Sequence, residues 1–262
     1  MGKYFDDIHA ACEIELRGLT SDIPDCAEVA EARKSTSDFD GCIALGKALS
    51  RQLRYREAAE AFSLALRIKP DDLEALRLRA GRYLSTLQTG KAYADLLRCL
   101  TLGGDALDIK YRLGLSDYFA GNFSRAMQHF EACMPLADDE MGIAVIYWHT
   151  LCAYRCVASA GLLAAYHTGT EVGHHFAYEK AVRVFSKSCA ANDMLEELDS
   201  ESEDLHYTIT AYGLSLFLRQ TGREAEGGIL FENVIERNSF WPCYAYLAAW
   251  NDKNGGGESV QS

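Results

Sequence analysis

The chain contains 262 residues, 48% of them hydrophobic and 24% charged, which is an ordinary composition for a globular domain or a repeat array. Its 38 acidic residues exceed its 26 basic ones, and the formal net charge is -12. Such a chain repels nucleic-acid phosphates unless its basic residues cluster, and we find no basic cluster, so we expect no nucleic-acid partner. Four prolines and long stretches rich in Ala, Leu, Arg and Glu favour helices, and the predicted fold class is all-α.

The cysteines and the lengths of the apolar runs indicate in which cellular compartment the protein is expected. Cys42, Cys99 and Cys133 fall at apolar sites of the helical pattern, which is typical of small buried thiols in a reducing cytosol. Acidic residues interrupt the apolar run that a signal peptide would need near the start of the chain. No window reaches the roughly 18 consecutive apolar residues of a membrane span. We therefore expect a cytoplasmic protein with no membrane partner.

The first 38 residues are expected to form an N-terminal helical cap. One amphipathic helix is predicted through Tyr4, Phe5, Ile8, Cys12 and Leu16, and a second helix after Pro24. A terminal cap of this kind gives a repeat array the polar outer face that keeps it soluble.

Residues 39–140 show an internal repeat of 34 residues. Three sets of residues recur at this spacing: Gly46, Ala80 and Gly114; Ala58, Ala92 and Ala126; Phe62, Leu96 and Phe130. A period of this length is typical of a helix-turn-helix unit that cannot bury its apolar face alone and stacks on copies of itself.

The first unit, which starts at Phe39, resembles the tetratricopeptide repeat (TPR). The resemblance rests on residues at the spacing of that family: Leu45, Gly46, Tyr55, Ala58, Phe62, Ala65 and Pro70. It implies a right-handed TPR-type α-solenoid of stacked antiparallel helix pairs. In such a pair, the small residues let the helices approach and the ring fills the space beside them. Units starting at Leu73 and Leu107 follow the same pattern more loosely.

The register degrades in residues 141–194, which we interpret as a divergent helical repeat or an insertion. Continuing the period places Trp148 where a glycine is expected and Ala160 where an alanine is expected, so two helices with altered packing are predicted. The sequence HTGTEVGHH is predicted to form a loop. Tyr178, Ala181 and Phe185 then have the spacing of a second helix.

The C-terminal part divides into three predicted segments. Residues 195–207 form an acidic connector, residues 208–251 a fourth TPR unit with an aromatic capping helix, and residues 252–262 a disordered tail. The rings of the capping helix could also join two copies of the chain in a homodimer.

Function is expected on the concave groove that the first helices of TPR units line. The resemblance places nine residues on this groove, of which Ile43 and Glu74 are two. The other seven are the predicted binding residues: Lys47, Arg51, Arg77, Tyr111, Leu115, Tyr118 and Phe119. A wall that is basic at one end and aromatic beyond suits a peptide or helix with an acidic group and large apolar anchors. We therefore predict a non-enzymatic scaffold for a protein or peptide partner. The alternative for Tyr118 and Phe119 is that they pack against the divergent unit.

Chemistry, if any, is expected in the middle region. His149, Cys152 and Cys156 are spaced three and four residues apart and so share one helix face, and zinc accepts such ligands. However, no Cys-x-x-Cys pair occurs and apolar helices often carry Cys in the core, so no metal, cofactor or catalytic residue is predicted. A metal- or thiol-dependent enzyme and a peptide-sensing regulator remain the alternative hypotheses.

Overall fold

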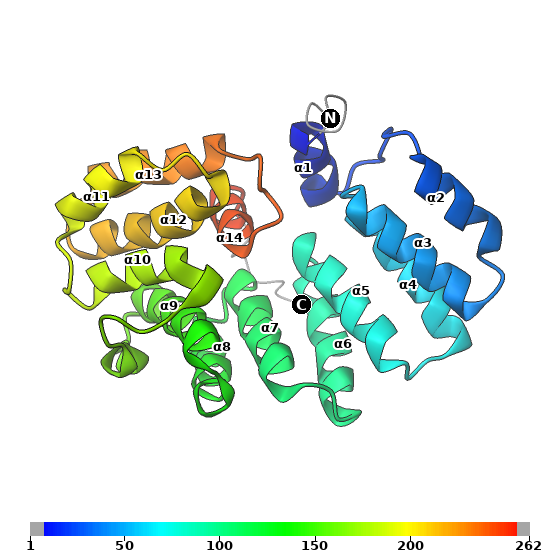
Figure 1. The fold of residues 1–262 in the computed structure, drawn as a ribbon, viewed down its shortest axis with the longest axis horizontal. Coiled ribbons are helices and arrows are strands. Elements are labelled where there is room, and N and C mark those ends of the chain that lie inside the picture. Colours follow the sequence, from blue (N-terminus) through cyan, green and yellow to red (C-terminus); the bar gives the residue numbers. More distant parts are fainter. Residues whose placement is uncertain (1–7, 256–262) are drawn as a thin grey trace. The chain divides into compact units, whose positions relative to one another are not determined.

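The computed structural model describes residues 8–255 and divides the chain into two compact units, residues 1–105 and 106–262 (Figure 1). Within residues 8–255 every regular element is a helix and no strand occurs, which confirms the all-α fold class. None of the helices in this part combines the length and the apolar character that crossing a membrane requires.

Unit 1 is built from six α-helices and one short 3-10 helix in its described part. They are α1 (Ile8–Arg17), α2 (Ala27–Ala32), η1 (Arg33–Ser35), α3 (Phe39–Arg51), α4 (Tyr55–Ile68), α5 (Leu73–Ser85) and α6 (Thr89–Thr101). α3 pairs with α4 and α5 with α6, and α4 also packs against α5. Two consecutive hairpins are therefore stacked, as the repeat predicts.

Close packing within each hairpin depends on the small residues of the repeat. Gly46 of α3 lies against the ring of Phe62 so closely that an added Cβ would overlap it. In the third hairpin an added Cβ on Gly114 would lie 2.7 Å from the ring of Phe130. Ala58 is fully buried at the crossing of the first pair. The sequence register thus corresponds to real helix contacts.

The turn between the two helices also repeats. Leu53 and Leu87, one period apart, adopt the left-handed conformation with φ of 60° and 55°. Gly121 and Gly222 follow with φ of 76° and 85° in the third hairpin and in the unit that starts at Thr208. This conformation is strained for leucine and easy for glycine, so its recurrence reflects a common turn geometry. These helix pairs of the chain therefore share one turn geometry.

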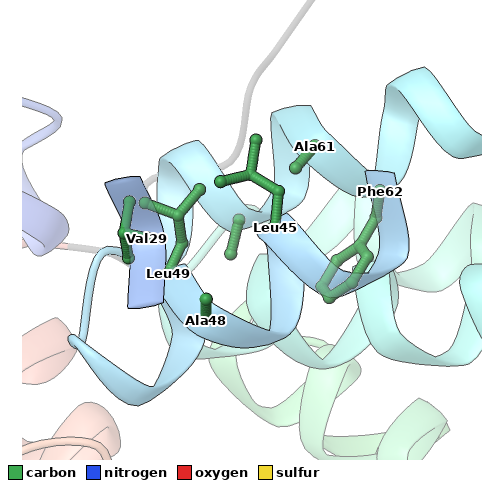
Figure 2. Packing of buried hydrophobic residues seen from close by; sticks show 7 residues of the cluster. Val29, Leu45, Ala48, Leu49, Ala61 and Phe62 are labelled. Carbon is green, nitrogen blue, oxygen red and sulfur yellow. The ribbon is translucent and has the colours of Figure 1, made fainter. Parts of the chain in front are cut away.

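The N-terminal segment covers the first hairpin. Val29 of α2 belongs to one buried cluster with Leu45 and Leu49 of α3, and Figure 2 shows it next to Leu49. Cys12 and Leu16 of α1 are buried, as the amphipathic pattern predicts. Tyr4 and Phe5 lie outside the described residues.

Unit 2 has eight α-helices in its described part. They are α7 (Ala106–Phe119), α8 (Phe123–Glu131), α9 (Asp139–Cys156), α10 (Phe176–Phe185), α11 (Ala191–Asp199), α12 (Asp204–Gln220), α13 (Glu224–Glu236) and α14 (Tyr244–Lys253). Short 3-10 helices accompany them: η2 (Met134–Leu136), η3 (Gly161–Ala165) and η4 (Gly173–His175). α7 pairs with α8, α9 with α10 and α12 with α13, while α14 returns to contact both α12 and α7.

The middle region is a hairpin interrupted by an insertion. α9 ends at Cys156, the next residue Val157 adopts the left-handed conformation with φ of 53°, and α10 begins only at Phe176. Ala160 therefore lies in the insertion and not in the second helix that the uninterrupted period predicted. The predicted loop at HTGTEVGHH is present over residues 167–172, whereas its last three residues form η4. α10 contains the predicted second-helix residues.

Two predicted segment boundaries differ from the structure. The acidic connector is partly helical, because α11 extends to Asp199 and α12 already begins at Asp204. The predicted tail begins too early, because Asp252 and Lys253 belong to α14. The rest of that tail, residues 256–262, lies outside the described residues. The side chains of Cys42, Cys99 and Cys133 are buried, as predicted.

Candidate protein interaction surface

In unit 1 the predicted groove residues lie on the first helices of the two hairpins. α3 carries Lys47 and Arg51 one turn apart, and α5 carries Arg77. All three side chains are partly or largely exposed. We call the surface formed by Lys47, Arg51 and Arg77 the inner-helix face of unit 1. Helix geometry thus brings one half of the predicted site to the surface.

The inner-helix face is charged in both signs and not purely basic. Lys47 Nζ lies 2.7 Å from Glu74 Oε1 of α5. Arg51 Nε donates to Glu28 Oε2 of α2 over 3.1 Å. This hydrogen bond lowers the pKa of Glu28 and raises that of Arg51. Exposed pairs of this kind gain little from each other in water, so their partners are readily exchanged.

In unit 2 the remaining four predicted groove residues are buried. Tyr111, Leu115, Tyr118 and Phe119 have exposed fractions of 8%, 0%, 3% and 2%. The ring centroid of Tyr118 lies 5.0 Å from that of Trp148 in α9, and the Phe119 ring lies 6.3 Å from Tyr244 in α14. This half of the predicted groove is therefore closed in the structure, because rings of α9 and α14 fill the space in front of α7.

A buried polar chain fixes α14 in this position. The hydroxyl of Tyr118 lies 2.7 Å from that of Tyr212 in α12. Tyr212 donates to Asp252 Oδ2 over 3.0 Å, and Arg155 Nη1 donates to the same oxygen over 2.7 Å. Burial raises the pKa of both tyrosines, so their hydroxyls stay neutral. The side-chain amide of Asn251 also donates to the Phe119 carbonyl over 2.8 Å.

Of the three candidate metal ligands, His149 and Cys152 are core residues and Cys156 is partly exposed. His149 is 1% exposed, and its Nε2 lies 3.3 Å from Glu131 Oε1. Burial lowers the pKa of His149 and raises that of the Cys152 thiol. Cys156 Sγ lies 3.7 Å from the sulfur of Met127. Across residues 8–255 no three His, Cys, Asp or Glu side chains are grouped to hold a metal ion.

Two acidic residues, Asp117 and Asp252, make contacts that were not predicted from the sequence. Asp117 is 1% exposed and accepts hydrogen bonds from Arg125, with Nε 2.8 Å from Oδ2. Asp117 stands at a repeat position where the TPR pattern usually has a ring, and Arg125 follows eight residues later. These two residues together could have indicated a buried charge pair. Asp252 was assigned to the tail because glycines follow it. The helical pattern that starts at Tyr244 could have been extended to include Asp252.

No family model matches the chain, and no curated protein does either. Among solved structures it is similar to the crystal structure of YrrB, described there as a TPR protein with an unusual peptide-binding site. The likeness covers 88% of this chain and 100% of that chain, with 12% identity and a TM-score of 0.45. The stacked helix pairs are established by the glycine packing and the turn geometry of this chain itself.

Proposed function

We propose that the chain is a non-enzymatic, cytoplasmic scaffold that docks a peptide or helix of a partner protein on the inner-helix face of unit 1. One observation carries this proposal. Lys47 and Arg51 remain exposed at repeat positions where unit 2, two periods later, buries Leu115 and Phe119. The charged side chains of Lys47 and Arg51 contribute little to the core of unit 1. They are therefore available to bind a partner at the surface.

The chemistry of this face favours a partner with carboxylates. An arginine guanidinium binds a carboxylate through two parallel hydrogen bonds, and arginine is over-represented among residues that dominate interface energy. A partner carboxylate can replace Glu28 at Arg51 or Glu74 at Lys47 at small cost, because both pairs are exposed. The net charge of -12 supports a protein partner over a nucleic acid.

The test combines site-specific cross-linking with charge reversal. A photo-reactive residue replaces Ser50, which lies on α3 beside Arg51, and cross-linked partners from the native cell are identified by mass spectrometry. The variant R51E/R77E, made in the same background, is expected to reduce the recovered partner at least about tenfold, or ~1.4 kcal/mol.

The matched control places the photo-reactive residue at Arg98, an exposed position of α6 that pairs with Asp71. A partner that cross-links equally well from Ser50 and Arg98, or that R51E/R77E leaves unchanged, contradicts the proposal. Helical content by circular dichroism is compared first, because both substitutions lie on the surface and are expected to leave the fold intact.

A further inference from the structure

Unit 1 also contains a cleft of about 1030 Å³ that lies apart from the inner-helix face, since none of Lys47, Arg51 and Arg77 lines it. Its walls are the turn at residues 18–21 after α1, one side of α4, the second half of α5 and the first turn of α6. Small-molecule sites occupy roughly 300–1,000 Å³. The cleft is therefore large enough for a segment of another protein.

The buried carboxyl group of Glu15 joins α1 to α4 at one wall of the cleft. The backbone N–H of Arg56, in the first turn of α4, donates to Glu15 Oε2 over 2.7 Å, and Arg56 Nε donates to the Glu15 carbonyl over 2.6 Å. Arg54, at the N-cap of α4, makes no side-chain cap of its own. Glu15 thus caps α4 from a separate helix, and this contact defines one side of the cleft.

Two of the arginines that line the cleft are neutralised. Arg54 pairs with Asp25 and with Glu57, whose Oε1 lies 2.7 Å from Arg54 Nε. Arg79 donates two hydrogen bonds of 2.7 Å to Asp95. These side chains are part of the framework and do not offer free charge to a ligand.

Two further cations of the cleft, Arg67 and Lys91, form no salt bridge within residues 8–255. Arg67 is exposed. Lys91 donates to the side-chain amide of Gln88 over 2.8 Å and lies 5.4 Å from the centre of the Tyr83 ring. The cleft therefore presents unpaired positive charge within a chain that is acidic as a whole.

The spacing along α4 gives the cleft a length. Arg56, Glu60 and Arg67 lie on one side of the helix, and the eleven helical steps from Arg56 to Arg67 rise about 16 Å. An extended chain advances roughly 3.3 Å per residue, so about five residues span this distance. Lys91, in the first turn of α6, is one period after Glu57 in the first turn of α4, so the repeat places Lys91 at the Arg56 end of the cleft and Arg67 at the other end. Glu60 of α4 places a negative charge between these two ends. Leu64 in α4 and Leu19, which is 55% exposed, add apolar surface.

We propose that this cleft binds an extended segment of a partner protein that carries an acidic side chain at each end and apolar side chains in the middle. Arg67 and Lys91 bind the carboxylates, Leu19 and Leu64 contact the apolar centre, and Glu60 excludes a third acid. The proposal is independent of the inner-helix face.

The probe is a fluorescein-labelled peptide, Glu-Ser-Leu-Leu-Ser-Glu, titrated with the full chain at low salt and followed by fluorescence anisotropy. Saturable binding is expected, and the peptide with Lys in place of both Glu is expected not to bind. R67E/K91E is expected to weaken binding at least about tenfold, whereas E60Q is expected to strengthen it, because E60Q removes the repelling charge.

The matched control is K34E/R98E, which changes the net charge by the same amount at exposed positions outside the cleft. The proposal is overturned if the acidic peptide does not bind, if the lysine peptide binds equally, or if K34E/R98E weakens binding as much as R67E/K91E does. R67Q/K91Q repeats the test without introducing new charge. R51E/R77E should keep full affinity, which separates this cleft from the inner-helix face.

Discussion

The two units place equivalent repeat positions in opposite environments. Arg51 and Phe119 are two periods apart on the first helices of their hairpins, as are Lys47 and Leu115, yet the first of each pair is exposed and the second is buried. The hairpins themselves are alike in their glycine contacts and turns. What differs is that α14 returns against α7 in unit 2. A repeat position thus becomes surface or core according to what later parts of the chain do.

The largest expected effect separates these environments directly. Phe119→Ala removes a ring that is 2% exposed and contacts Trp148 and Tyr244, so we expect it to reduce the free energy of unfolding by about 3–5 kcal/mol. Arg51→Ala, at the equivalent position of unit 1, is expected to leave the unfolding transition unchanged. Urea unfolding followed by circular dichroism measures both.

Tryptophan fluorescence adds a reporter for one unit. All three tryptophans of the chain, Trp148, Trp241 and Trp250, lie in unit 2. Phe119→Ala should therefore shift the fluorescence transition to lower urea. A fluorescence transition that Phe119→Ala leaves in place would contradict the burial of this half of the predicted groove.

The terminal helices of the two units are held by different chemistry, and pH should distinguish them. Glu15 fixes α1, and its burial raises its pKa from 4.5 to about 7. Tyr118 and Tyr212 take part in fixing α14, and burial moves their pKa further above the neutral range. Of these contacts, only that of Glu15 in unit 1 is expected to change in strength near neutral pH.

The sign follows from the direction of the Glu15 shift. Its carboxyl is protonated more readily when α1 is docked than when it is free, so docking is strongest below pH 4.5 and weakens as pH rises through about 7. The full effect is on the order of 3 kcal/mol. Hydrogen exchange of α1 amides, measured from pH 5 to pH 8 and corrected for intrinsic rates, should show this loss.

Glu15→Gln is the control for this pH effect, because an amide oxygen still accepts the Arg56 N–H but does not titrate. Protection of α1 should then become independent of pH in this range. Protection of α14 is expected to stay constant in both proteins. A loss of protection in α1 that persists unchanged in Glu15→Gln would assign the pH response to another group.

Much of the fold could be predicted because it depends on local spacing. The contact of Gly46 with Phe62 lies within one period, and so does the contact of Gly114 with Phe130. Each follows from helix geometry once the register is known. The same reasoning correctly placed Cys42 in the core.

The candidate site could be predicted only in part, because its environment depends on distant contacts. Tyr118 meets Tyr212 across 94 residues of sequence, and Asn251 reaches the Phe119 carbonyl across 132. A period of 34 residues carries no information about such contacts. The pairing of Lys47 with Glu74, 27 residues away, could have been predicted, because both residues belong to the predicted groove surface.

The smallest expected effect tests what the units share. Ala58 and Ala126 are both fully buried at the same repeat position, one in each unit. Replacing either by leucine adds methylene groups where the helices of a pair cross, and we expect a loss of about 1–3 kcal/mol in each case. Ala94→Leu, at an exposed position of α6, is the control and should change stability by less than about 0.5 kcal/mol.

The two alanine substitutions should also differ in which probe reports them. Ala126→Leu is expected to shift the tryptophan fluorescence transition, because its helix pair belongs to unit 2, which holds all the tryptophans. Ala58→Leu should shift the circular dichroism transition and leave fluorescence in place if the units unfold independently. If both probes shift together for Ala58→Leu, the units unfold as one cooperative body. If neither substitution changes stability, the repeat register itself is wrong, because a leucine would then fit where the helices were assigned their closest approach.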